Sequence, residues 1–200
     1  MEKESTAEVQ RIKEAAKKDH VPVMMESGMN YLLEYIRTHP EILRILECGT
    51  AVGLSAIRMA SIRENIMIDT LEIDPDMYDQ AVKNIRNAGL SDRVFVHFTD
   101  ASLFNTNQYY DLFFIDAAKS QYRMYLEHFF ENSHIGSVFV FDNMNFHGIV
   151  DQPELSQNRS TLQLTRKIRK FREHMAEDSR FETEYSPSIG DGILTAVRIR

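Results

Sequence analysis

Short strand-like segments alternate with helical segments along most of this chain, and this alternation constrains its fold more than any other feature. Apolar residues recur with helical spacing at 26–38, 54–63, 75–88, 120–132 and 162–177. Runs rich in β-branched and aromatic residues lie among them at 42–48, 67–72, 94–98, 111–115 and 136–141. Strands that are joined by helical crossovers pair in parallel. The pattern therefore predicts an α/β fold with a doubly wound, mostly parallel sheet.

Two further extended segments, at 181–185 and 192–198, close the chain, and only a short turn with Pro187 and Gly190 separates them. Such a turn is too short for a crossover, so these two strands are expected to be antiparallel. We therefore expect a Rossmann-like, seven-stranded sheet with an antiparallel C-terminal hairpin. No linker or repeat divides the 200 residues. The chain is predicted to form a single domain over 1–200, with 1–20 as an N-terminal extension or helix and a core at about 21–200.

The composition indicates the cellular compartment in which the chain works. No apolar stretch approaches the ~20 residues that a membrane span needs, so no membrane partner is expected. The first residues, MEKE, do not resemble a secretory leader. A lone cysteine, Cys48, excludes an internal disulfide and a cysteine-based zinc site, as in a reducing compartment. The protein is predicted to be cytoplasmic.

Charge is unevenly distributed. The net charge of -7 argues against nucleic acid as a partner, because phosphate binding relies on clustered basic residues. However, residues 159–172 contain six basic residues and no acid. On a helix there, Arg166, Lys167, Arg169 and Lys170 would lie mostly toward solvent, opposite an apolar stripe. Either this is an ordinary solvated helix face, or it binds a polyanion.

Acidic residues end two of the predicted strands. Asp116 follows the run 113–115, and Asp142 with Asn143 follows the run 138–141. Ligands of open α/β sheets gather beyond the carboxyl ends of the strands, so these three oxygen donors are expected to converge. Two carboxylates and an amide suit a hard divalent cation such as Mg²⁺. The alternative is that each acid only caps the segment that follows it.

A second group of residues at strand ends has the pattern of a nucleoside site. Residues 47–53 read ECGTAVG, in which Gly49 and Gly53 let the backbone pass close to a ligand. The spacing differs from the GxGxxG dinucleotide motif, and such a turn also occurs as plain punctuation between a strand and a helix. Glu72 ends the next strand, where an acid can bind ribose hydroxyls, and Asp100 follows the third, near an adenine amine. Together they predict an adenosine site.

The motifs ILECGTAVGLSA, LEIDP, FTDA, FFIDAAKSQY and FVFDN resemble those of class I S-adenosylmethionine-dependent methyltransferases, within them the metal-dependent O-methyltransferases of the catechol and caffeoyl-CoA type. The resemblance covers about residues 21–200. More narrowly, HVPVMMESGMNYLL and GDGIL resemble the bacterial tRNA 5-hydroxyuridine methyltransferases. The resemblance implies a single methyltransferase domain that binds S-adenosyl-L-methionine and Mg²⁺ or another divalent cation, and that forms a homodimer.

The resemblance also implies roles for particular residues. Cofactor contacts are implied at Met24, Gly49, Thr50, Gly53, Ser55, Glu72, Ile73, Asp100, Ala101 and Asp116. Metal ligands are implied at Asp116, Asp142 and Asn143, and catalytic roles at Lys119 and Asp116. Lys119 is either a general base or a surface lysine at a helix start. Tyr122 and His147 are weaker candidates, the first as a core residue and the second as a loop residue that could touch substrate.

Four functions are compatible with these residues. The leading hypothesis is methylation of 5-hydroxyuridine at the tRNA wobble position to 5-methoxyuridine, with the basic helix on the anticodon stem. The alternative is O-methylation of a small catechol or hydroxycinnamoyl compound, against which the short N-terminal segment counts, because it offers little material to cover a small pocket. An NAD-dependent dehydrogenase is disfavoured by the glycine spacing and the Asp116, Asp142 and Asn143 set. A cofactor-binding protein without catalysis is the last possibility.

Overall fold

A computed structural model describes residues 2–200, with side chains from residue 7 onward. Its seven-stranded sheet has the order β3-β2-β1-β4-β5-β7-β6. The five strands β1 to β5 pair in parallel, and β7 is antiparallel to both β5 and β6. The strands are β1 (Arg44–Cys48), β2 (Met67–Glu72), β3 (Val94–Phe98), β4 (Tyr110–Ile115), β5 (Ser133–Phe141), β6 (Phe181–Ser186) and β7 (Ile193–Arg198). The predicted parallel sheet and antiparallel C-terminal strands are confirmed.

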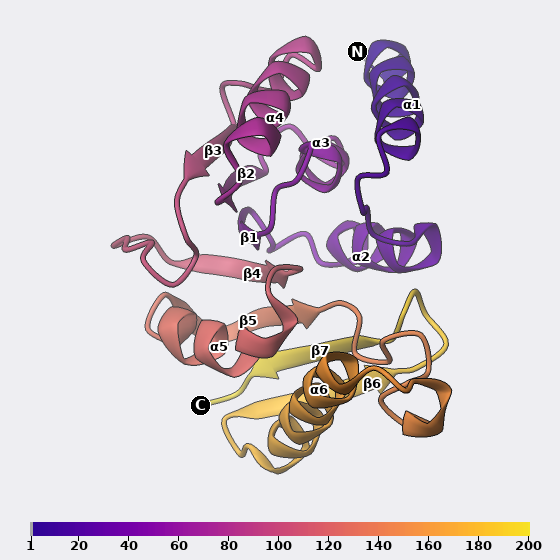
Figure 1. Cartoon of the computed structure of the whole chain (residues 1–200). Helices are drawn as coiled ribbons and strands as arrows, with labels where there is room; N and C mark the ends of the chain where they lie inside the picture. The colour runs from indigo at the N-terminus through magenta and orange to yellow at the C-terminus, as the bar shows by residue number, and fades with distance from the viewer. Residues whose placement is uncertain (1) are drawn as a thin grey trace.

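Helices cover both faces of this sheet (Figure 1). One face packs against α1 (Glu2–Lys18), α2 (Glu26–Thr38), α3 (Leu54–Ala60) and α4 (Pro75–Asn87). The other packs against α5 (Tyr122–Phe130) and α6 (Arg159–Glu177). Short 3-10 turns occur at η1 (Lys119–Gln121) and η2 (Pro153–Leu155). No described helix has the length and apolar character of a membrane span.

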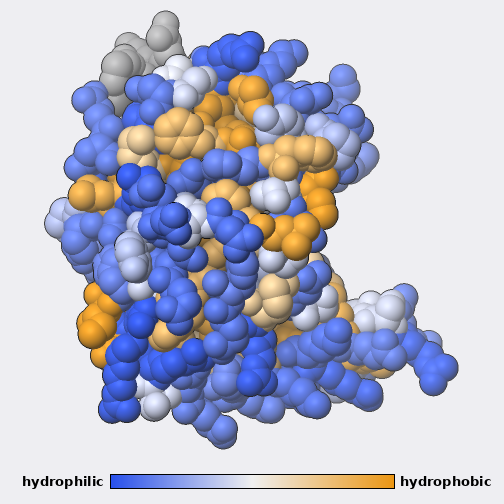
Figure 2. Space-filling model, turned by 90° about the vertical axis from the view of Figure 1, so that its left-hand side faces the viewer, coloured by the Kyte–Doolittle hydropathy of each residue, from blue (hydrophilic) through white to orange (hydrophobic). Residues whose placement is uncertain are grey.

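The alternation of side chains along the central strands builds a core on each face. Leu112 and Phe114 of β4 pack with α1 to α4, whereas Phe113 and Ile115 point to α5 and α6. The second core is aromatic, since Phe113 stacks on Phe139 at a centroid distance of 4.2 Å. The outer surface differs, being largely hydrophilic with separate hydrophobic patches on the face shown in Figure 2. The residues between strands and helices are thus fixed by a core on either side.

The order of the strands reverses between β1 and β4, and this position determines where a ligand can bind. The chain moves outward from β1 through β2 to β3, then returns to the far side of β1 as β4. Loops after β1 and β4 therefore diverge to opposite faces and leave a crevice at their carboxyl ends. Gly49, Asp116 and the residues after β5 all lie at this edge.

Several element boundaries differ from the sequence-based expectation, and two of these differences have a clear physical cause. β5 begins at Ser133 rather than at residue 136, because Ser133 pairs with Tyr110 ahead of a register shift. α6 begins at Arg159 rather than at residue 162, since the Asn158 side chain accepts hydrogen bonds from the N–H groups of Ser160 and Thr161. Polar residues set both boundaries, and polar residues do not contribute to the apolar pattern from which the elements were predicted.

The aromatic core makes a direct prediction for stability. Replacing Phe139, which is fully buried, by Ala should lower the free energy of unfolding by about 3 to 5 kcal/mol in urea titrations. The matched control is Ile135→Ala on the same strand, where the side chain is 70 % exposed. Its effect should stay within about 0.5 kcal/mol. Equal losses in the two variants would contradict the placement of this core.

Candidate active site

A cavity of about 610 Å³ opens at the carboxyl ends of β1, β2, β4 and β5. Residues from both halves of the sheet line it, together with residues 21–25 between α1 and α2. Eleven of the residues singled out in the sequence lie in its wall: Met24, Gly49, Glu72, Ile73, Asp100, Ala101, Asp116, Lys119, Asp142, Asn143 and His147. The structure thus brings the predicted nucleoside site and the predicted metal ligands to one cavity.

The remaining predicted cofactor residues lie beside that cavity. Thr50 and Ser55 line a neighbouring cavity of about 570 Å³, which shares Met24, Gly49 and Asp116 with the first. Gly53 lines neither cavity. It precedes α3 at a φ of 79°, and a Cβ there would touch Ala81 and Ile85 of α4 at 3.4 Å. The structure therefore supports a helix-packing role for Gly53.

Gly49 allows the turn after β1 to meet the loop after β4. Its φ is +101°, which side chains rarely adopt, and a Cβ would overlap the carbonyl oxygen of Asp116. Hydrogen bonds hold the same junction, because the N–H of Asp116 donates to Cys48 O at 3.0 Å and that of Gly49 to Leu71 O at 3.0 Å. Only glycine lets the two loops approach this closely.

Glu72 is held rigidly at the end of β2. Its side chain accepts hydrogen bonds from the N–H groups of Ala51 at 2.7 Å and of Ile73 and Asp74 at 2.9 Å each. Since an ionised carboxylate can accept about four hydrogen bonds, roughly one position stays open toward the cavity. Asp100 is fixed in a similar way, accepting from Ser102 N at 2.8 Å. Both acids are preorganised acceptors.

A third acid, Glu47, lies near the end of β1, two residues before Gly49. It is fully buried, and the hydroxyls of Ser55 and Thr70 donate to its carboxylate. Thr50 shares a hydrogen bond of 2.6 Å with Thr70, so the side chains of Thr50 and Ser55 belong to this network. Burial raises the pKa of Glu47 to about 7, and the nearby Asp116 and Glu72 add to the effect. The sequence motif contained Glu47 without indicating this role.

Asp116 and Asp142 form the acidic end of the cavity. Burial and the neighbouring Asp116 raise the pKa of Asp142 to about 7. Burial also raises the pKa of Asp116, and the only described ammonium beside it is that of Lys119, whose Nζ lies 3.5 Å from Asp116 Oδ1. Asn143 adopts a φ of 58° and donates its N–H to Asp142 Oδ1 at 2.7 Å. The buried carboxylate of Asp142 and the half-buried carboxylate of Asp116 thus share one nearby cation, the Lys119 ammonium.

Two of the weaker candidates occupy defined positions at this end. Tyr122 is buried among Phe141 and Phe171, and its hydroxyl donates to the backbone carbonyl of Asp142 at 2.8 Å. It is a core residue, as expected, and it also supports the end of β5. His147 lines the cavity, as does Asp191 from the turn between β6 and β7. The sequence analysis did not single out Asp191, although it quoted the motif GDGIL, which contains this residue.

The basic face of α6 is smaller than the sequence suggested. Arg166, Lys167 and Lys170 are exposed, but Arg169 is half-buried. The Arg169 guanidinium donates to the carbonyl oxygen of Val150, so it anchors the loop after β5 rather than facing solvent. The prediction that Arg169 belongs to a solvent-facing surface is wrong, because the loop at 144–156 folds back onto this helix.

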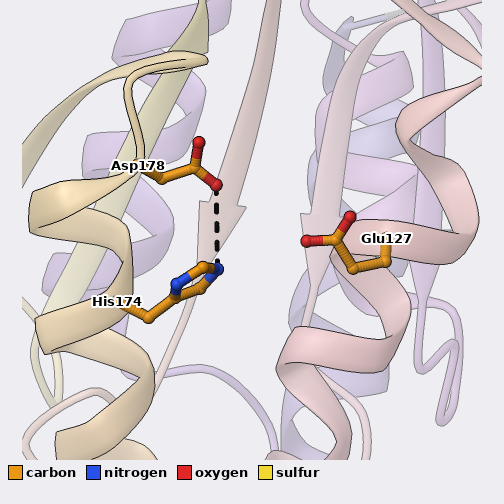
Figure 3. A group of neighbouring side chains, drawn as sticks. All are labelled: Glu127, His174 and Asp178. Carbon is orange, nitrogen blue, oxygen red and sulfur yellow. Dashed lines mark ion pairs between the residues drawn. The ribbon is translucent and has the colours of Figure 1, made fainter.

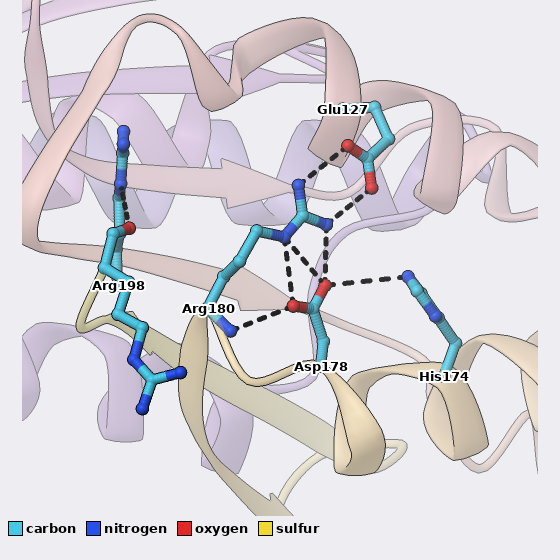
Figure 4. A network of polar contacts seen from close by, with 6 residues as sticks. Glu127, His174, Asp178, Arg180 and Arg198 are labelled. Atoms are coloured by element: carbon cyan, nitrogen blue, oxygen red, sulfur yellow. Dashed lines mark hydrogen bonds and ion pairs between the residues drawn. The ribbon is translucent and has the colours of Figure 1, made fainter.

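A separate cluster of possible metal ligands lies outside this cavity, at Glu127, His174 and Asp178 (Figure 3). Their ligand atoms lie within 4.8 Å of one another. However, the Arg180 guanidinium already bridges Glu127 and Asp178, with contacts of 2.6 Å to each (Figure 4). A cation would have to displace this arginine. We interpret the cluster as an ion-pair network that joins α5, the end of α6 and the start of β6.

Comparison with known proteins agrees with this geometry. A family model described as O-methyltransferase matches residues 2–199. A caffeoyl-CoA O-methyltransferase from Stellaria longipes is 27% identical over 177 residues, which cover 84% of this chain and 73% of that protein. A catechol O-methyltransferase from Niastella koreensis is 31% identical over 165 residues, covering 76% and 72%. An O-methyltransferase from Bacillus cereus, solved in complex with SAH, superposes with a TM-score of 0.81 at 25% identity over 96% of this chain and 91% of that one.

The crevice at the strand reversal, with a glycine turn on one side and paired acids on the other, defines an α/β transferase site of the methyltransferase type. The chain belongs to the O-methyltransferase family. This assignment favours methyl transfer over the dehydrogenase and the non-catalytic binding protein that the sequence left open. Its single-domain, Rossmann-like fold is that of the structural relative.

The buried Glu47 predicts how stability depends on pH. Its pKa rises from 4.5 in the unfolded chain to about 7 in the fold, so the folded state holds the proton more tightly. Its contribution is complete below pH 4.5 and is lost as pH rises through 7, a loss of up to about 3 kcal/mol. Glu47→Gln has no such proton. Urea titrations should therefore show wild type losing stability relative to Glu47→Gln over this range.

The matched control for that experiment is Glu64→Gln, which changes an exposed glutamate. Its stability should follow that of wild type at every pH. A constant difference between wild type and Glu47→Gln across the titration would show that Glu47 has the same pKa in the folded and unfolded states and would contradict the raised pKa.

Proposed function

We propose that this O-methyltransferase transfers a methyl group from S-adenosyl-L-methionine to one of two adjacent hydroxyls on a small catechol or hydroxycinnamoyl-type acceptor, with a divalent cation, Mg²⁺ by preference. One observation carries the proposal. The buried carboxylate of Asp142 and the half-buried carboxylate of Asp116 lie in the wall of the same cavity as Glu72 and Asp100. This arrangement supports a nucleoside-binding end and a cation-binding end within one cavity.

The donor set at the acidic end fits a hard divalent cation. Asp116, Asp142 and Asn143 offer oxygen atoms only, as Mg²⁺ prefers. Both carboxylates have raised pKa values, chiefly from burial, and the neighbouring Asp116 adds to that of Asp142. Lys119 compensates only part of the negative charge of the two carboxylates, and a divalent cation would compensate the rest. The chemistry supplied by such an ion is a lowered pKa of the acceptor hydroxyl and neutralisation of two neighbouring oxygens.

The side chains of the chain itself perform binding, orientation and proton removal. Glu72 would accept hydrogen bonds from the ribose hydroxyls, and Asp100 would accept one from the exocyclic amine of the adenine. Lys119 lies in the cavity wall beside Asp116, where its ammonium can donate a hydrogen bond that orients the acceptor hydroxyl; to take the proton of that hydroxyl, it must first release its own. Holding both reactants in one cavity would contribute much of the acceleration, on the order of 7 to 11 kcal/mol in favourable cases.

The acceptor class rests on two observations. The matched relatives include a caffeoyl-CoA and a catechol O-methyltransferase. In addition, residues 21–25 line the cavity, and α1 with His20 borders the adjoining one. The N-terminal part of the chain therefore contributes to the walls of both cavities, although its shortness counted against a small acceptor. Both observations favour the small acceptor over the leading hypothesis from the sequence.

Methylation of 5-hydroxyuridine in tRNA is the second candidate. It is supported by the exposed Arg166, Lys167 and Lys170 on α6, which form a local basic surface on an acidic protein. The modified base also carries a hydroxyl beside a carbonyl, so its oxygens could share one cation. The loss of Arg169 from this surface weakens the argument.

The acidic end of the cavity predicts a specific variant phenotype. Asp142→Ala should lower methyl transfer by about 100-fold or more, because a charged ligand of the cation is lost. Binding of S-adenosylhomocysteine, measured by calorimetry, should change little, since Glu72 and Asp100 remain. Asp92→Ala, at an exposed acid far from the cavity, is the control and should match wild type. Full turnover in Asp142→Ala would overturn the role of this cation site.

The acceptor class can be tested with labelled cofactor and Mg²⁺. Caffeoyl-CoA should be methylated, and the analogue that lacks one of its adjacent hydroxyls should not be. Chelation with EDTA should abolish turnover. If the enzyme incorporates label into tRNA carrying 5-hydroxyuridine but does not methylate caffeoyl-CoA, the second candidate function replaces the first. In that case Arg166→Ala combined with Lys170→Ala should lower the incorporation.

A further inference from the structure

Asp191 is a buried acid in the wall of the cavity that the proposed reaction does not use. It lies between β6 and β7 and is 5% exposed. Its Oδ1 accepts a hydrogen bond of 2.6 Å from the backbone N–H of His147. Its Oδ2 is buried without a hydrogen-bond partner and lies 3.6 Å from His147 Nδ1. Because a buried, unpartnered carboxylate oxygen is costly, its position calls for a compensating role.

The segment that Asp191 holds is strained. Phe146 has a φ of 46° and His147 a φ of 56°, both in the left-handed region that favours glycine. Gly148 continues the same conformation at 83°. Consecutive non-glycine residues with positive φ persist only where surrounding contacts enforce them. The Asp191 carboxylate provides such a contact at His147.

The backbone of the same turn clamps the preceding residues. Asn145 N donates to Asp191 O at 2.8 Å, and Met144 N donates to Gly192 O at 2.9 Å. Gly192 has a φ of 82°, and a Cβ there would lie 2.7 Å from Asn145 N. The turn between β6 and β7 thus holds residues 144–147, which directly follow the proposed metal ligands Asp142 and Asn143.

We propose that Asp191 is a positioning residue that fixes the His147 imidazole at the acceptor end of the cavity. This inference rests on the proposed function. With Nδ1 turned toward the carboxylate, the imidazole presents Nε2 to the cavity as a hydrogen-bond acceptor. That arrangement suits an acceptor substrate carrying a hydrogen-bond donor, such as the second hydroxyl of a catechol. The His147 side chain is 75% exposed, so it is accessible to such a substrate.

Two substitutions at Asp191 separate its two contacts. Asp191→Asn keeps an oxygen for the His147 N–H and loses the charge that faces the imidazole. Asp191→Ala loses both. By hydrogen exchange, the amide of His147 should remain protected in Asp191→Asn and exchange faster in Asp191→Ala. Unchanged exchange in Asp191→Ala would overturn the clamp, whatever the protein methylates.

Acceptor binding provides the second readout. With caffeoyl-CoA, Asp191→Asn and His147→Ala should each raise the acceptor KM by about tenfold, leaving S-adenosylhomocysteine affinity within about twofold. The double variant should be no worse than either single one, because both act through one contact. Additive effects, or a KM that stays at the wild-type value, would overturn the positioning role. Glu154→Gln, at an exposed acid of the same loop, should behave as wild type.

The outcomes distinguish this inference from the proposed function. If wild type methylates caffeoyl-CoA and Asp191→Asn leaves the KM unchanged, only the role of Asp191 fails. If wild type neither methylates nor binds caffeoyl-CoA, the proposed acceptor fails, together with the assigned orientation of His147 toward it. The exchange measurement then still decides whether Asp191 clamps the strained segment.

Discussion

The close approach of two loops at the strand reversal is the constraint on which the rest of the site depends. The turn after β1 and the loop after β4 meet where Gly49 lacks the side chain that would overlap Asp116. A side chain at this position would push the turn after β1 away from the loop after β4. The missing Cβ therefore lets the proposed nucleoside-binding and cation-binding halves of the site lie next to each other. The cost is one left-handed residue, which glycine adopts without strain.

Burial of three acids around this junction is the second physical theme. Glu47, Asp116 and Asp142 have raised pKa values, with burial as the largest cause in each case. Two hydroxyls satisfy Glu47, so its carboxyl is complete within the fold. Asp116 and Asp142 have a lysine and one backbone N–H, which leaves several oxygen positions open. The carboxylate of Glu47 thus has a structural role, whereas those of Asp116 and Asp142, whose oxygens are only partly hydrogen-bonded, are suited to bind a ligand.

The sequence predicted those parts of the molecule that depend on local pattern. Apolar runs such as 113–115 end at the sheet edge, so Asp116 and Asp142 could be placed together without coordinates. The start of β5 was missed because the pairing of Ser133 with Tyr110 depends on the neighbouring strand. Arg169 was assigned to solvent because helical period does not reveal a loop folded over the helix. Asp191 was missed because its partner, His147, lies 44 residues away in the chain.

The same distinction separates the two ends of the cavity. Three successive strand ends, after β1, β2 and β3, form the nucleoside end, and each is marked by a local motif. The acceptor end combines residues 21–25, the strained loop at 144–147 and the turn at Asp191, which are distant in sequence and lack a regular period. Their arrangement is held by backbone hydrogen bonds between loops, so substitutions there can reshape the pocket while the sheet stays intact. Under the proposed function, acceptor choice therefore depends on contacts between segments that are distant in the sequence, which are hard to predict, whereas the fold that supports methyl transfer depends on local patterns, which are easier to predict.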